Sequence, residues 1–241
     1  MSAFEAVTFD HWNTLAYEDG GELRGRRIAA WTTMLADAGV DASTEIVTIA
    51  FEAAWDQFLV HWAAGRHFDG AEAAGVAADA LPVAVDAPLR ARLVDAFVRS
   101  GDGVDFHLAD GIEECLSALK DAGLKLGIVC DVGFTPSTTL RDHLDRRGLL
   151  RYFDGWSFSD EVGVYKPEAA IFEHALTTVG NPEPQRVAHV GDLRRTDVAG
   201  ANAMGITSVR YTGVFDDDPQ NGPEADIVVK HHLELLPALG L

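Results

Sequence analysis

The sequence predicts an α/β protein in which a doubly wound parallel sheet forms the core and an α-helical cap is inserted after the first strand. Two features support this prediction. Short apolar runs alternate with helical segments over the second half of the chain, which is typical of parallel strands joined by crossover helices. Between the first apolar run and this alternation, the apolar spacing is helical throughout. We therefore expect residues 1–15 and 107–241 to form the core and residues 16–106 to form the cap.

The first strand is expected at residues 3–9, because this apolar run ends at Asp10 and is followed by a polar turn. In the expected cap, Trp55, Phe58 and Trp62 recur at helical spacing and are predicted to pack in its interior. The first half of the chain thus supplies one strand and then only helices.

Local signals mark the starts of further elements. Asp69 and Glu72 form a capping box before an alanine-rich helix, and Pro88 stands in the first turn of the next helix. Earlier cap helices are expected at 26–38 and 46–62. After the cap, strands are expected at 124–129, 156–158, 187–190, 207–210 and 226–229, with helices at 111–122, 136–147, 167–179 and 196–204 and at the C-terminus.

Composition and charge limit the possible functions. The chain has 241 residues, of which 47% are apolar, so a buried core is expected and a disordered or fibrous protein is excluded. Lys and Arg number 19 and Asp and Glu 38, which gives a net charge of −19. Binding to nucleic acid or to an anionic membrane is therefore not expected. A phosphorylated substrate would need a local cation, either a metal ion or one of the four lysines.

The two cysteines, Cys115 and Cys130, show no paired spacing, so neither a disulfide nor a cysteine-based zinc site is expected. The N-terminus has no signal-peptide pattern, and no apolar run reaches the roughly 18 residues of a membrane span. These observations predict a soluble cytoplasmic protein. They do not determine its oligomeric state.

Polar residues stand at the ends of three expected strands. Asp10 ends the first strand, Cys130 and Asp131 end the second, and Asp192 ends the fourth. Ligands of open parallel sheets bind at the carboxyl ends of the strands. Lys166 precedes a predicted helix, and carboxylates gathered beside a lysine suit Mg²⁺ and phosphate. The sequence therefore predicts a site for Mg²⁺ and a phosphorylated substrate at this edge of the sheet.

These residues resemble four motifs of the haloacid dehalogenase (HAD) superfamily, in the branch whose helical, C1-type cap follows the first motif. Residues 9–15 (Phe-Asp-His-Trp-Asn-Thr-Leu) are similar to the first motif, 128–131 to the second, 163–167 to the third and 191–201 to the fourth. The resemblance spans nearly the whole chain. It implies a Rossmann-like core, Mg²⁺ as the cofactor, and a hydrolase acting on a small phosphorylated metabolite.

The resemblance also implies a role for each motif residue. Asp10 would be the nucleophile that forms an aspartyl-phosphate, and it would also bind Mg²⁺. Lys166 would neutralise the charge of the nucleophile and the phosphate. The other implied roles are Mg²⁺ binding by the Trp12 backbone carbonyl, Asp192 and Asp197, and contact with the transferred group from Thr14, Cys130 and Asp131.

Position 12 departs from the motif, because phosphatases of the superfamily carry a second Asp there, which protonates the leaving group and activates water. Trp12 can do neither, and loss of a general acid–base group costs on the order of 10²–10⁴ in rate. Substrates with good leaving groups should suffer a smaller loss of rate, and His11, Asp131 or a residue of the cap are candidate substitutes for the missing group. Asn13 replaces the usual Gly, but Asn tolerates a left-handed turn.

Two other functions remain open. The dehalogenases of the superfamily also lack Asp at position 12, so a hydrolase that attacks carbon is one alternative, although the pair Gly191–Asp192 opposes it. A catalytically weak protein that binds a phosphorylated ligand or a partner protein is the other. The phosphonatases use a cap lysine, and residues 16–119 contain none.

Other charged residues are expected on the surface. Arg24, Arg26 and Arg27 would form a solvated helix face or, alternatively, would meet an anionic substrate. His231 and His232 show no metal-ligand spacing and are expected to be exposed.

Overall fold

The computed structural model describes residues 3–241, which divide into two compact units. The α/β unit contains the residues up to Tyr17, Phe106–Asp131 and Leu144–Leu241. The helical unit contains Glu18–Asp105 and Val132–His143. No helix of the described residues is both long and apolar enough to cross a membrane.

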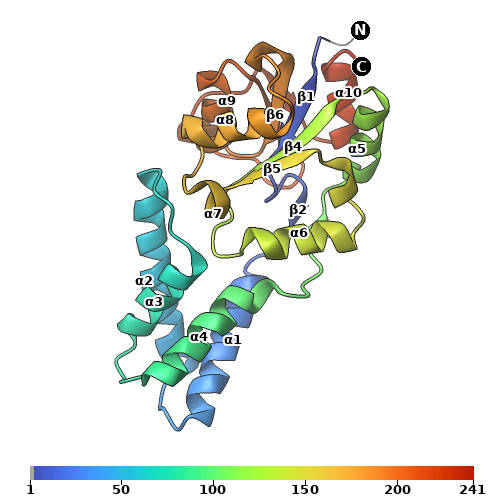
Figure 1. The fold of residues 1–241 in the computed structure, drawn as a ribbon. Helices are drawn as coiled ribbons and strands as arrows, with labels where there is room; N and C mark the ends of the chain where they lie inside the picture. The colour runs from blue at the N-terminus through green and yellow to red at the C-terminus, as the bar shows by residue number, and fades with distance from the viewer. Residues whose placement is uncertain (1–2) are drawn as a thin grey trace. The chain divides into compact units, whose positions relative to one another are not determined.

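The α/β unit is built on a six-stranded parallel sheet of order β5-β4-β1-β6-β7-β8 (Figure 1). The strands overlap all six strand predictions: β1 Ala6–Phe9, β4 Lys125–Cys130, β5 Gly155–Phe158, β6 Val187–Gly191, β7 Thr207–Tyr211 and β8 Ile227–Val229. The α/β class with a parallel sheet is confirmed. Strand β1 lies at the centre, and its four residues are buried because both faces of the sheet are covered.

Helices cover the two faces of this sheet. Figure 1 shows α8 (Ala169–Thr178) and α9 (Ala199–Ala203) on one side, and α5 (Ile112–Asp121) and α10 (Leu235–Ala238) on the other. The short α7 (Ser159–Val162) precedes α8. The apolar face of α8 buries Ile171, Phe172 and Ala175 against strand residues that include Val129 and Val187. The two helical layers therefore hold the strand ends in fixed positions.

Three local features of the α/β unit differ from the sequence prediction. A two-residue antiparallel pair, β2 (Ala16–Tyr17) and β3 (His107–Leu108), is too short to produce a recognisable pattern. The helix expected at 196–204 is divided into a π-helical turn, Arg194–Val198, and α9. His232, expected at the surface, is fully buried: its ring stacks on Tyr211, and its Nε2 donates to the Thr14 carbonyl at 2.8 Å.

The helical unit contains α1 (Glu22–Asp37), α2 (Thr44–Ala63), α3 (Gly70–Ala80) and α4 (Ala87–Val98). Helix α1 contacts α2 and α4, and α3 contacts the same two helices. The predicted capping box is present, because the Glu72 backbone N–H donates to Asp69 and the Asp69 backbone N–H donates to Glu72. Pro88 lies in the first turn of α4, as predicted.

The segment Val132–His143, which the expected boundaries assign to the core, belongs to the helical unit. Its Phe134 ring contacts Phe58 at 5.1 Å and Phe97 at 5.5 Å between ring centroids. Helix α6 (Ser137–Arg146) begins in this segment. Trp55 also differs from expectation, since it is about half exposed whereas Phe58 is buried. Contacts between residues so distant in sequence leave no periodic signal, so the sequence could not place this segment.

Candidate active site

The topology of the sheet gathers the carboxyl ends of three strands. Strand β1 lies between β4 and β6, and its last residue, Phe9, is in register with Ile128 of β4 and Val190 of β6. Asp10 therefore follows the central strand, while Asp192 follows β6 and Asp131 follows β4. These residues stand at the edge of the sheet at which the sequence predicts the site.

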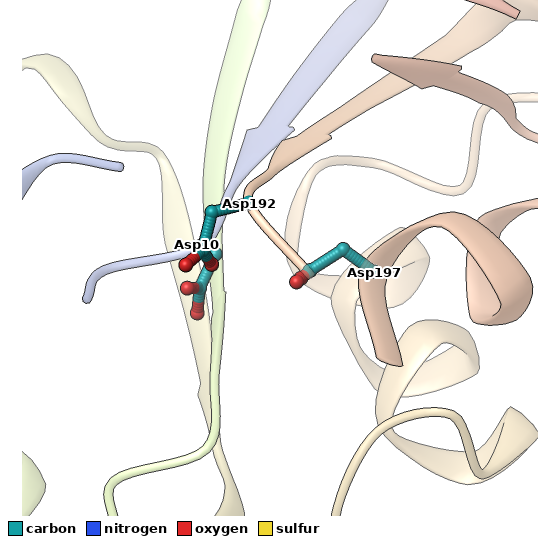
Figure 2. Close-up of side chains that lie close together, drawn as sticks. All are labelled: Asp10, Asp192 and Asp197. Atoms are coloured by element: carbon teal, nitrogen blue, oxygen red, sulfur yellow. The ribbon is translucent and has the colours of Figure 1, made fainter. Parts of the chain in front are cut away.

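A cluster of three carboxylates lies at this edge. Asp10, Asp192 and Asp197 each place an oxygen within 4.8 Å of the others, and all three are nearly inaccessible to solvent (Figure 2). Burial, assisted by the neighbouring carboxylates, raises the pKa of Asp10 to about 7, although Lys166 opposes this. Burial, with Asp10 and Asp197, also raises the pKa of Asp192 well above its usual value. These carboxyl groups need additional positive charge nearby in order to ionise. Hard carboxylate oxygens are the ligands that a divalent cation such as Mg²⁺ prefers, so the cluster fits such an ion.

Lys166 lies in the middle of this cluster. Its Nζ donates to Asp10 Oδ1 at 2.7 Å and to Asp197 Oδ1 at 2.6 Å, and its side chain is buried. Burial alone would lower its pKa, but Asp10 and Asp197 outweigh this effect, and the pKa of Lys166 is well above its usual value. Its backbone N–H donates to Asp131 Oδ1 at 2.9 Å. Lys166 is therefore a fixed cation beside Asp10.

Asp197 uses both of its oxygens within the protein. Oδ1 accepts from Lys166 and from His189 Nε2 at 3.0 Å, and Oδ2 accepts from the Leu193 backbone N–H at 3.1 Å and from the Thr196 hydroxyl at 3.3 Å. Burial would raise its pKa, but Lys166 and His189 outweigh burial and lower it. Asp197 is thus held as a carboxylate in one orientation, whereas the side chain of Asp192 accepts, among the described residues, only from the Asn13 side chain at 3.1 Å.

Two residues that were not predicted from the sequence, Thr8 and His189, lie behind this network. They are register partners on β1 and β6, and the Thr8 hydroxyl lies 2.9 Å from His189 Nδ1. Burial lowers the pKa of His189, so the ring is neutral. Since the Asp197 carboxylate can only accept, Nε2 carries the proton and Nδ1 accepts from Thr8. Two polar residues within otherwise apolar strands were the signal that could have identified them.

At two positions of the fourth motif, the neighbouring atoms leave room only for glycine. A Cβ on Gly191 would overlap the carboxyl group of Asp197, and a Cβ on Gly200 would overlap the ring of Phe172. The first glycine lets Asp197 approach the end of β6, and the second lets α9 pack against α8.

The turn after β1 presents Asn13 and Thr14. Asn13 has a φ of 56°, in the left-handed region, as predicted for the residue that replaces Gly. The hydroxyl of Thr14 is buried and has no hydrogen-bond partner within residues 3–241. Buried hydroxyls nearly always have a partner, so this group is suited to contact an oxygen of a bound ligand.

Cys130 and Asp131 lie on either side of the end of β4. Cys130 is fully buried, and its pKa is raised well above the usual value, first by burial and then by Asp10. It is therefore a neutral thiol and a weak donor. Asp131 is only partly buried, and its Oδ1 accepts the Lys166 backbone N–H. The structure thus brings Asp131 to the Lys166 backbone and gives it a structural contact there.

Trp12 has aromatic neighbours. Its ring lies edge-on to Phe106, with the centroids 5.2 Å apart, and edge-on to His11 at 4.9 Å. His11 is fully buried. The indole at this position packs against other rings, and it has no group that exchanges a proton near neutral pH.

Comparison with known proteins identifies the family. The family model described as haloacid dehalogenase-like hydrolase matches residues 4–205. The chain belongs to this family of enzymes. The chain is 35% identical over 127 residues to pyrimidine 5'-nucleotidase YjjG of Escherichia coli (strain K12). The aligned segment covers 52% of this chain and 55% of that protein. It is 33% identical over 148 residues to phosphoserine phosphatase of Thermus thermophilus, and this alignment covers 61% of this chain and 57% of that protein.

The chain spans about half the length of the curated relatives that it matches. Among solved structures, it is similar to a HAD phosphatase from Thermococcus onnurineus, with a TM-score of 0.65, 25% identity and 98% of each chain covered. This HAD-like hydrolase therefore shares its α/β fold with a phosphatase over nearly its full length.

Proposed function

We propose that this HAD-like hydrolase is an Mg²⁺-dependent phosphatase of small phosphorylated metabolites, and that Asp10 receives the phosphoryl group. The observation that carries the proposal is the position of Lys166, whose ammonium group bridges Asp10 and Asp197 inside the carboxylate cluster. A fixed cation beside a buried carboxylate lets that carboxylate approach an anionic phosphate. The relatives named as a nucleotidase and a phosphoserine phosphatase support the same class of substrate.

The residues for Mg²⁺ are the carboxylates of Asp10 and Asp192 and the backbone carbonyl of Trp12. Asp197, whose oxygens are both hydrogen-bonded, would orient Lys166 and contact the ion only through water. When bound, Mg²⁺ supplies positive charge that polarises the phosphoryl group and offsets the repulsion between the carboxylates. The raised pKa values of Asp10 and Asp192 support such a site, because both carboxylates need a compensating cation in order to ionise there.

In the first step, an oxygen of Asp10 attacks phosphorus, the bond from phosphorus to the leaving oxygen breaks, and the leaving group departs with the electron pair. Lys166 donates to Oδ1, and Oδ2 accepts no hydrogen bond from the described residues, so Oδ2 is the better placed to attack. The Thr14 hydroxyl and the Cys130 thiol contact the oxygens of the transferred group. In the second step, water attacks phosphorus and the bond between phosphorus and the Asp10 oxygen breaks, which regenerates the Asp10 carboxylate and releases inorganic phosphate, while the protons of the water pass to the phosphate and the solvent.

Trp12 determines which substrates this enzyme can use. It cannot protonate a departing alkoxide, so alkyl phosphates, whose leaving groups have a high pKa, should react slowly. Acyl and aryl phosphates need little protonation and should react faster. We therefore expect a preference for phosphates with good leaving groups.

The test is a substrate panel of acetyl phosphate, p-nitrophenyl phosphate and several sugar phosphates, each with and without Mg²⁺ and beside the variant Asp10→Asn. Mg²⁺-dependent phosphate release that the variant abolishes supports the proposal. Chloride release from a 2-haloacid, with no phosphate release, would instead establish the dehalogenase-like alternative. Stabilisation by phosphorylated ligands without any turnover would show a binding protein.

A further inference from the structure

The helical unit contains a pocket of about 490 Å³, which is within the usual range of roughly 300–1,000 Å³ for small-molecule sites. Four aromatic side chains line it: Phe51, Trp55, Phe97 and Phe134. The planes of Phe51 and Phe97 are inclined by 43°, and those of Trp55 and Phe134 by 87°. Rings inclined in this way offer both faces and edges to a flat apolar group.

Arg27, also in the lining of this pocket, is a buried cation with only 6% of its surface exposed. Its Nε donates to the Phe97 carbonyl at 3.2 Å, and its Nη2 donates to the Phe134 carbonyl and the Thr135 hydroxyl, each at 3.3 Å. The guanidinium carbon lies 4.7 Å from the centre of the Phe97 ring. Neutral acceptors and a ring face thus surround the charge.

No carboxylate of the described chain forms an ion pair with Arg27. Burial lowers its pKa to about 10, and the charge of Glu18 raises it only in part. Charged groups that are this inaccessible are normally paired with an opposite charge. Nη1 makes no hydrogen bond to residues 3–241, so one edge of the guanidinium retains its donors.

The other charged groups of the pocket already have partners. Arg24 pairs with Glu52 at 3.4 Å, and both side chains are at least half exposed. Glu18 accepts the Leu23 backbone N–H at 2.6 Å, near the start of α1. Among the described residues that line the pocket, Arg27 is therefore the cation that forms no ion pair with a carboxylate.

We propose that this pocket binds a small planar aromatic anion, whose ring packs among Phe51, Trp55, Phe97 and Phe134 and whose carboxylate, or a similar anionic group, accepts hydrogen bonds from Arg27. The two N–H groups of Nη1 make no hydrogen bond to residues 3–241, so they can donate charge-assisted hydrogen bonds to that anionic group. Nothing in this proposal depends on phosphatase activity, because binding requires neither Mg²⁺ nor turnover.

The test compares three probes that share one ring system and differ in charge: 2-naphthoate, 2-naphthamide and 2-naphthamidine. Their affinities for the full chain are measured by isothermal titration calorimetry in buffer that contains no Mg²⁺ or carboxylate. We expect the anion to bind at least roughly tenfold more tightly than the neutral amide, because its hydrogen bonds to Arg27 are charge-assisted. The cation should bind most weakly.

Variants locate the effect. Arg27→Met should remove the difference between naphthoate and naphthamide, while Arg26→Met should preserve it. Arg26 is a matched control, since it lies on the same helix, is exposed, and pairs with Glu22. Equal affinity for the three probes, tighter binding of the cation, or full retention of the difference in Arg27→Met would each overturn the proposal. If Arg27→Met does not fold, the three-probe comparison on the unmodified chain still decides.

Discussion

Lys166 in the α/β unit and Arg27 in the helical unit are both nearly inaccessible to solvent, but their charges are compensated differently. Lys166 contacts two carboxylates within 2.7 Å, whereas Arg27 contacts two carbonyls, a hydroxyl and an aromatic ring. The first arrangement has an excess of negative charge, since Asp192 adds a third carboxylate. In the second, the groups in contact with the cation are neutral. This difference is why we propose a metal ion for the first site and an anionic ligand for the second.

The largest expected change in the free energy of unfolding comes from replacing Lys166, the cation that contacts carboxylates. Lys166→Met would leave Asp10 and Asp197 buried without a counter-charge, and loss of one partner of such a pair destabilises a protein by about 3–5 kcal/mol. Urea unfolding measures the change in the free energy of unfolding. Arg27→Met is the matched variant and should cost less, about 1–3 kcal/mol, because Phe97 keeps the Arg99 backbone N–H as a donor and the Phe134 carbonyl and Thr135 hydroxyl that lose a donor are neutral. Equal losses in the two variants would remove the distinction between the cations.

Asp10→Asn should separate activity from stability. Loss of the nucleophile should lower phosphatase turnover by roughly a thousandfold or more. The free energy of unfolding without Mg²⁺ should stay the same or rise, because the raised pKa of Asp10 shows that burial disfavours its ionised form. Phosphate release and urea unfolding are measured on the same preparation. A variant that turns over normally would exclude Asp10 as the nucleophile.

Trp12→Asp should supply a side chain that protonates the leaving group, which the candidate active site lacks at this position. A general acid at this position should raise the rate on alkyl phosphates by on the order of a hundredfold, with a much smaller gain on acetyl phosphate. Steady-state kinetics on both substrates gives the ratio. A variant that folds and binds Mg²⁺ but gains nothing on alkyl phosphates would contradict the role assigned to position 12.

A smaller change in stability, dependent on pH, is expected from His232, a buried titratable group. Burial lowers its pKa from 6.5 to about 4. As pH falls below 6.5, the unfolded chain binds a proton that the folded chain does not bind until about pH 4, so stability decreases over this interval. The decrease should reach about 2 kcal/mol at pH 5 relative to pH 8.

His232→Gln should remove most of this pH dependence, because the amide donates to the Thr14 carbonyl but does not titrate in this range. The measurement is urea unfolding at a series of pH values. His231→Gln, at the neighbouring and partly exposed position, is the control and should retain the decrease. The same slope in both variants would assign the pH dependence to other groups.

Much of the α/β unit could be predicted from the sequence. Strands buried on both faces appear as continuous apolar runs, and residues that follow adjacent parallel strands must meet at one edge. Asp10 and Asp192 were identified in this way, and Lys166 was identified from its position before a predicted helix; the structure places Asp10 beside both. The pairing of His189 with Thr8 was missed because it depends on the register of two strands far apart in the chain.

The helical unit was less predictable. The buried residues of α1 are Leu23, Arg27, Trp31 and Leu35, at intervals of four, so Arg27 occupies a position of the apolar face. That spacing was a usable signal, but the neighbouring arginines suggested a solvated surface instead. The contribution of Phe134 could not be predicted, since it comes from a segment that follows β4 and therefore lies far from α1 and α2 in the sequence.

The central claim is that Asp10 carries the phosphoryl group during turnover. It is tested by mixing the protein with radiolabelled acetyl phosphate and Mg²⁺, quenching in acid within the first turnover, and locating the label in peptides. We expect a base-labile phosphoryl group on Asp10 that disappears when unlabelled substrate is added before the quench. Release of phosphate with no label on Asp10 at any time would contradict it.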